Sequence, residues 1–146
     1  KAGGSGGAAA VDASTPEGMG TAAGEIYKGA LDALVKALES KPEPADAKAK
    51  ATAIIDGAKT SLVELGKKRE ALAPADKATF DKAAAAGISS VSSKTFDAYS
   101  AIASHYRTAD REVGNLIGEA NTLTQYANFD LLKKQAPKEA EKYGVK

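Results

Sequence analysis

The chain has 146 residues, of which 43% are hydrophobic and only 5% aromatic, and its 20 basic and 19 acidic side chains leave a net charge of +1. This length suffices for one domain with a core, and the balanced charge argues against nucleic-acid binding, which needs a basic surface. The lack of cysteine excludes disulfides and thiolate metal sites. The sequence contains no run of about 18 apolar residues, so it predicts no transmembrane segment.

Residues 1–20 predict a disordered, flexible leader rich in Gly, Ala and Ser. The first ten read KAGGSGGAAA, a composition that cannot bury enough apolar surface to fold. Because the sequence begins with Lys1 and not with methionine, we expect that a preceding segment has been removed. A signal peptide or a lipid-anchored cysteine at a cell envelope would leave such a leader. The alternative is vector-derived sequence followed by an ordinary ragged terminus.

Apolar residues that recur every three or four positions predict helices from there on. The first helix is expected over about 21–40 and the second over about 45–72, separated by the segment SKPEP. The two prolines of that segment end one helix and allow the next to begin. Because the connection is short, the two helices are expected to form an antiparallel hairpin.

A continuous stripe of apolar and small residues then runs from Phe80 to Ala127. An unbroken helix of this length would extend about 70 Å, roughly twice the length of the earlier helices. We therefore predict two helices, 75–106 and 109–127, with Thr108 capping the second. The alternative is one long helix with a kink in the segment ISSVSS, which follows Gly87 and is poor in helix formers. The stripe consists of Phe80, Ala84, Ile88, Val91, Thr95, Ala98, Ile102, Tyr106, Ala109, Val113, Leu116, Ala120, Leu123 and Ala127.

The predicted fold class is therefore all-α. We predict a four-helix up-down-up-down bundle over residues 21–146, with a short C-terminal appendage from about residue 128 that folds back over an open end. The alternative is a helical hairpin packed against one long kinked helix.

The sequence predicts no catalytic, cofactor-binding or metal-binding residue. His105 is the only histidine. Di-metal bundles require a glutamate three residues before the histidine, and this chain has none there. Met19 and His105 are haem ligand types, but the predicted topology places them at opposite ends of the bundle. The serines at 89, 90, 92 and 93 have no histidine within reach to act as a base. The Gly114–Gly118 spacing indicates close approach of a neighbouring helix.

One edge of the predicted bundle combines tyrosine with small polar side chains. Such residues provide both contact area and hydrogen bonding, as recognition surfaces do, so we predict a partner-binding surface there. The alternative is that the tyrosines lie half in the core with their hydroxyls in water. The residues are Tyr99, Tyr106, Asn115, Asn121, Thr122, Gln125, Tyr126 and Asn128.

Together these features predict a non-catalytic helical-bundle protein, secreted or in the cell envelope, that binds another protein or serves as a structural module. The alternative is a small-ligand carrier that holds an apolar molecule within the bundle. An enzyme ranks last, since no catalytic constellation is found in the sequence. No cofactor and no nucleic-acid partner are expected.

Overall fold

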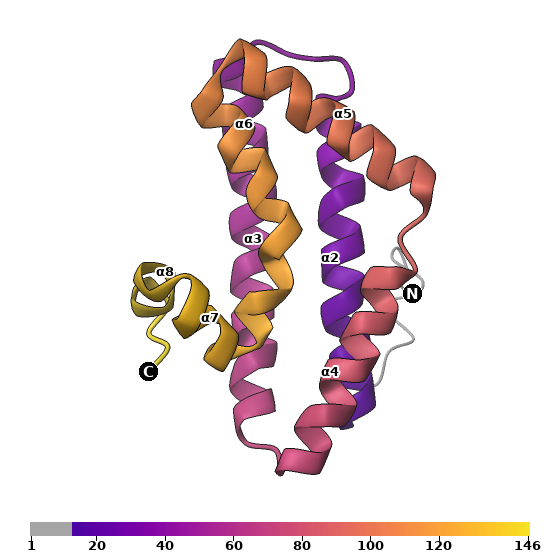
Figure 1. The fold of residues 1–146 in the computed structure, drawn as a ribbon, viewed down its shortest axis with the longest axis vertical. Helices are drawn as coiled ribbons and strands as arrows, with labels where there is room; N and C mark the ends of the chain where they lie inside the picture. The colour runs from indigo at the N-terminus through magenta and orange to yellow at the C-terminus, as the bar shows by residue number, and fades with distance from the viewer. Residues whose placement is uncertain (1–12) are drawn as a thin grey trace.

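The structure is a computed structural model that describes residues 13–146, and these residues form helices without any strand (Figure 1). The predicted all-α class is confirmed. Most of the predicted leader, residues 1–12, lies outside the described residues. In chain order the elements are α2 (Pro16–Leu38), α3 (Pro44–Glu70), α4 (Pro74–Ser89), α5 (Ser93–Ala109), α6 (Arg111–Gly118), the 3₁₀ segment η1 (Glu119–Ala127), α7 (Phe129–Gln135) and α8 (Pro137–Lys142).

Proline opens α2, α3, α4 and α8. Its fixed φ suits the first helical turn, where its missing N–H removes no intrahelical hydrogen bond. Helix α2 begins at Pro16, earlier than the predicted start at 21, because the Thr15 side chain accepts a hydrogen bond from the Gly18 N–H at 3.0 Å. As a result, Met19 and Gly20 are buried within a helix.

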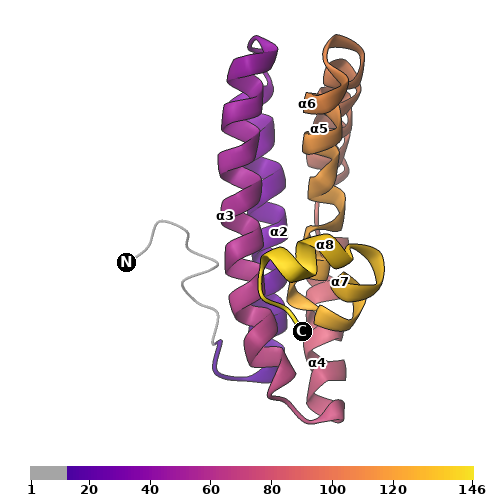
Figure 2. The same cartoon turned by 90° about the vertical axis from the view of Figure 1, so that its left-hand side faces the viewer.

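The helices lie in two layers (Figure 2). One layer holds α2 and α3, which run antiparallel as predicted, and the other holds α4, α5, α6 and η1. Helix α4 packs mainly along α2, in the same direction, and barely touches α3, to which it is directly connected. The segment formed by α6 and η1 runs along α3, again in the same direction, since Lys48 pairs with Glu112 and Lys59 with Glu119.

Helices α2 and α4 touch backbone to backbone. A Cβ atom added at Gly24 would lie 2.8 Å from the Gly87 Cα, and one added at Gly20 would collide with the Phe80 carbonyl oxygen. Only glycine permits this approach, and it allows two small-residue helix faces to bury each other. The sequence analysis assigned Gly20 to the flexible leader, so it did not predict this contact.

The long stripe is broken twice. Helix α4 ends at Ser89, and α5 restarts after Ser92, whose hydroxyl accepts from the Thr95 N–H at 3.1 Å. A second break follows Ala109, where the Asp110 carboxylate accepts from the N–H groups of the next turn at 3.1 and 3.3 Å. The single predicted helix 75–106 is therefore wrong, as are the predicted cap at Thr108 and the alternative of one long kinked helix. In each case a side chain satisfies the backbone donors that a helix start leaves free.

The chain after Asn128 packs along the side of the molecule (Figure 2). The prediction that it covers an open end of the bundle is therefore wrong. The Phe129 ring sits directly against Gly66 of α3, at a place where any side chain would collide with it. Leu132, Ala140 and Val145 are buried in the same region. A glycine on α3 thus receives the returning chain, which anchors α7 and α8 beside α3 and η1.

Candidate functional site

Two of the predicted surface tyrosines are internal ties. Tyr99 is 1% exposed, and its hydroxyl donates a hydrogen bond to the Ile117 carbonyl at 2.8 Å, which joins α5 to α6. Tyr106 is fully buried and donates to the Pro42 carbonyl in the α2–α3 loop. Both rings are buried, so Tyr99 and Tyr106 are not part of a partner-binding surface. Both hydroxyls bond to backbone carbonyls, so the alternative prediction of hydroxyls in water is also wrong for these two residues.

Three other predicted residues come together. Thr122, Gln125 and Tyr126 line one open cleft of about 500 Å³ between α3, η1 and α8. Asn115 and Asn121 are exposed, but they do not line this cleft, and Asn128 lines a separate recess beside α4. The predicted surface is therefore not continuous, and only Thr122, Gln125 and Tyr126 lie together, in the cleft.

Lys59 forms the centre of the cleft wall. It is 4% exposed, and its Nζ donates to Glu119 Oε1 at 2.7 Å and to Glu139 Oε1 at 3.0 Å. The same Glu139 oxygen accepts from the Tyr126 hydroxyl at 2.7 Å, and the Lys59 ammonium lies 5.1 Å from the centre of the Tyr126 ring. One buried cation thereby connects α3, η1 and α8, with the aromatic face beneath it contributing a cation–π contact.

Hydrogen bonds within this cluster keep Lys59 and Glu139 in their charged forms. Burial alone would lower the pKa of Lys59, but its hydrogen bonds to Glu119 and Glu139 outweigh burial and raise that pKa. Burial would raise the pKa of Glu139, yet hydrogen bonds from Tyr126 and Lys59 hold it below its ordinary value of 4.5. Burial and the hydrogen bond to Glu139 raise the pKa of Tyr126. At neutral pH Lys59 is thus an ammonium, which cannot act as a nucleophile.

Gln125 is the unusual member of the cleft. It is 8% exposed, and its Oε1 is buried without a hydrogen-bond partner among the described residues. Buried carbonyl oxygens are rarely left without a donor, because desolvation then costs about 1–3 kcal/mol. This oxygen is covered by the surrounding protein and is not part of the surface that the cleft opens to solvent.

Arg69 forms a second buried tie that sequence reasoning missed. Its guanidinium donates two hydrogen bonds of 2.8 Å to the carboxylate of Asp81, which joins the end of α3 to α4. It also lies 5.8 Å from the centre of the Phe80 ring and 3.5 Å from the Glu70 carboxylate. Its partner Asp81 lies on another helix, and no local spacing in the sequence indicates the pairing.

Across residues 13–146, no group of three or more histidine, cysteine, aspartate or glutamate side chains is arranged to hold a metal ion. Met19 lies near the start of α2, whereas His105 precedes Tyr106, which bonds to the loop at the other end of α2. The two haem ligand types are therefore far apart. Gly114 packs against the Arg107 backbone at the α5–α6 corner, as its spacing predicted.

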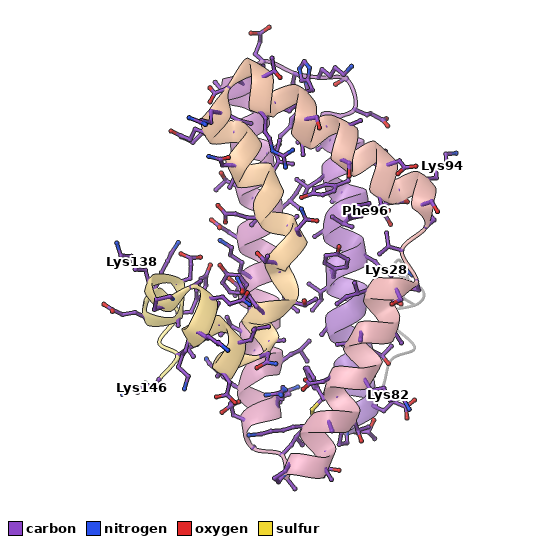
Figure 3. The ribbon with its side chains drawn as sticks, in the orientation of Figure 1. Lys28, Lys82, Lys94, Phe96, Lys138 and Lys146 are labelled. Carbon is purple, nitrogen blue, oxygen red and sulfur yellow. The ribbon has the colours of Figure 1, made fainter. Side chains whose placement is uncertain are left out.

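The exposed lysines are spread over the molecule. Figure 3 shows Lys82 and Lys94 pointing outward from α4 and α5, and Lys138 and Lys146 pointing outward around α8. Phe96 and Leu131 are the large hydrophobic side chains of the described part that stay exposed, at 41% and 37%. Within that part, no helix is both long and apolar enough to cross a membrane.

Comparison of the chain with protein-family models, with curated proteins and with solved structures gave no significant match.

Proposed function

We propose that this chain is a non-catalytic helical module that binds another protein or has a structural role. In this proposal the molecule is a variant of the four-helix up-down-up-down bundle. Helices α2 and α3 are its first two members, α4 with α5 the third, and α6 with η1 the fourth. The alternating directions of these segments support this description, while the side-by-side packing of α2 and α4 distinguishes it from a simple sequential bundle.

The observation that carries the functional proposal is the cleft between α3, η1 and α8. Its lining includes Thr122, which is exposed, and Gln125 and Tyr126, which are only 8% and 3% exposed. An exposed hydroxyl in a concave surface with charged walls can hydrogen-bond to a partner, so the cleft suits recognition. The buried charges Lys59 and Arg69 hold helices together in ion pairs, so they support an architectural role and not a chemical one.

A capture experiment with matched variants tests the proposal. Thr122→Arg places a long charged side chain at the rim of the cleft, and Thr60→Arg makes the same change at an exposed position of α3 that does not line it. We expect wild type and Thr60→Arg to retain the same crosslinked protein, and Thr122→Arg to lose it. If all three proteins retain the same set of partners, the cleft is not the recognition surface.

We also propose that the protein is secreted or held in a cell envelope, with a lipid anchor as one means of attachment. This proposal is supported by sequence composition, namely the Gly, Ala and Ser content of residues 1–10. Fractionation of cells that express the protein from its own gene with a C-terminal tag tests it. Recovery of the tagged protein with cytosolic proteins would contradict it.

The alternative, a carrier for a small apolar molecule, is favoured by one observation. A recess of about 190 Å³ lies between α2, α4, η1 and α7, and its lining includes Ala23, Phe80, Ile88 and Leu131. Native mass spectrometry of protein purified from its source tests this alternative. A retained apolar ligand that Ala23→Phe displaces would support it, and wild-type protein with no added mass would count against it.

A further inference from the structure

We propose that two copies of this chain form a dimer by exchanging the segment from α5 to the C-terminus, with α4 and α5 straightened into one helix. Residues 93–146 of each copy then pack on α2 and α3 of the other, through the same contacts that they make within one chain. This inference does not depend on the proposed function. Three observations support it: the junction between α4 and α5, the face that these two helices share, and the distribution of contacts on either side of the junction.

The junction between α4 and α5 lies close to helical geometry. It consists of Ser90, Val91 and Ser92, and it contains neither proline nor glycine. Ser90 is already in the helical region, with φ −82° and ψ −5°, and Ser92 has φ −67° and ψ 149°. Because an α-helix has φ of about −63° and ψ of about −42°, Ser92 differs from a helical residue in ψ alone. A continuous helix through this junction is therefore allowed by its residue types.

The other junctions between the long helices are fixed. Prolines open α3 and α4, and a proline inside a helix removes a hydrogen bond and clashes with the preceding turn. At the α5–α6 corner, Gly114 packs on the Arg107 backbone, and the Tyr99 hydroxyl donates to the Ile117 carbonyl at 2.8 Å. Asp110 at this corner has φ −159° and ψ 105°, far from helical in both angles. Among the long helices of the described part, the α4–α5 junction is thus the one that can straighten.

The apolar stripe keeps one face through the junction. Its members from Phe80 to Tyr106 all lie within about 80° of the circumference of a continuous helix. In the single chain both ends of this stretch are buried, whereas Ile88, Val91 and Ala98 near the break are only partly buried. A recess of about 210 Å³ also lies between α2 and the junction. The bend is therefore incompletely packed at the place where the shared face would continue.

The contacts of the chain divide into two groups at the junction. Before it, α4 packs along α2, with Gly24 against Gly87. After it, α5 turns away from α4 and crosses α2 toward α6 (Figure 1). Helices α4 and α5 barely touch each other, and a recess of about 190 Å³ lies between α4 and the η1–α7 segment. Residues 93–146 can therefore separate from α4 with little loss of contact, and the surface on which they pack is present on any second copy.

The ion pairs between the two groups can form equally well between two copies. Lys48 pairs with Glu112, and Lys59 with Glu119 and Glu139, so each pair joins a residue before the junction to one after it. Because the exchanged dimer forms the same pairs between copies, it leaves no buried charge unpaired, and exchange of this kind is a low-cost route to a dimer. Each cleft between α3, η1 and α8 then has walls from two chains, and one dimer carries two such clefts.

The Lys48–Glu112 ion pair allows a direct test on the unmodified chain. Equal amounts of ¹⁴N- and ¹⁵N-labelled protein are mixed in denaturant, refolded at millimolar concentration, and separated by size-exclusion chromatography with light scattering. Carbodiimide then links the Lys48 amine to the Glu112 carboxylate, and mass spectrometry identifies the isotopes of the linked peptides. We expect a dimer in which about half of these links carry both isotopes, because random pairing makes half of the dimers mixed. Links in the monomer should carry one isotope.

Two substitutions at the junction should shift the equilibrium in opposite directions. Ser93→Pro places proline at the first position of α5, as in α2, α3, α4 and α8, and prevents a continuous helix. It should abolish the dimer. Ser92→Ala removes the hydrogen bond to the Thr95 N–H, which only the bent form makes. It should lower the dimer dissociation constant about 25-fold, from about fivefold for each chain.

Arg111→Pro is the matched control, because it places proline at the first position of α6, a corner that stays bent in both forms. Its dimer fraction should equal that of wild type. The inference is overturned by a wild-type dimer without mixed links, or by the absence of a dimer in wild type and Ser92→Ala alike. A folded Ser93→Pro protein that dimerises as readily as wild type would also overturn it. The isotope experiment needs no substitution, so it remains decisive even if Ser93→Pro fails to fold.

Discussion

The contact between α2 and α4 makes a quantitative prediction about two glycines of one helix. Gly24→Ala places a Cβ atom 2.8 Å from the Gly87 Cα, which is shorter than the 3.4–4 Å of ordinary contact, whereas Gly29→Ala meets nothing within 4 Å. Both changes remove a glycine from α2, and each therefore gains about 1 kcal/mol of helix propensity. The two variants differ in packing alone, since Gly24 faces backbone that cannot rotate away. Overpacking of this kind costs about 1–3 kcal/mol.

Thermal unfolding followed by circular dichroism measures this difference. We expect Gly29→Ala to melt above wild type and Gly24→Ala to melt about 3–10 °C below Gly29→Ala, from the relation between free energy and melting temperature for a domain of this size. Gly87→Ala should behave like Gly24→Ala, because its Cβ would lie 2.7 Å from the Gly24 Cα. If Gly24→Ala stabilises as much as Gly29→Ala, the two backbones do not touch and the arrangement of the layers is wrong.

Further predictions concern Lys59, Glu139 and Tyr99, whose ion pairs and hydrogen bonds join different helices. Lys59→Met should lower the free energy of unfolding by about 1–3 kcal/mol in chemical denaturation, because it leaves two carboxylates without their cation. The control Lys50→Met removes an exposed ion pair and should change the free energy of unfolding by less than about 0.5 kcal/mol. Because the pKa of Glu139 is lowered in the folded state, its contribution is present above pH 4.5 and disappears as the pH falls through the folded pKa. Glu139→Gln should therefore flatten the acid limb of a stability-versus-pH curve, and an unchanged limb would contradict this. Burial raises the pKa of Tyr99 from 10.0 to about 12, so its contribution is present below pH 10 and is lost as the pH rises toward 12. Tyr99→Phe should remove that alkaline loss, as measured by unfolding at pH 9 and 11.

Local patterns were sufficient for the fold class and for the starts of α3, α4 and α6, which were predicted to within two residues. Helical periodicity predicted the all-α class, and the prolines at 44 and 74 marked two helix starts closely. Of the two breaks in the long stripe, the second was predicted, with Thr108 as its cap, and the first, at Ser92, was not. The structure selects Asp110, because a carboxylate accepts from two backbone N–H groups at once and favours the positive end of the helix.

The candidate site could be predicted only in part. Thr122, Gln125 and Tyr126 were identified by residue type, but their neighbour Lys59 was not. Its partners Glu119 and Glu139 are 60 and 80 residues away in the sequence, so no local spacing indicates the pairing. The same reasoning failed for Tyr99 and Tyr106, because amphipathic side chains suit a wet surface and a hydrogen-bonded interior equally well.

The composition of the core explains why polar ties are placed where the layers meet. Alanine and glycine allow helices to approach closely, but they bury little area and differ little from one turn to the next. A stripe of such residues specifies its register weakly, since sliding by one turn would bring similar side chains together. The hydrogen bond from Tyr106 to Pro42 and the paired hydrogen bonds from Arg69 to Asp81 each form in one register alone. We therefore attribute to these ties, and to Lys59, the choice of a single alignment among several that the small residues would allow.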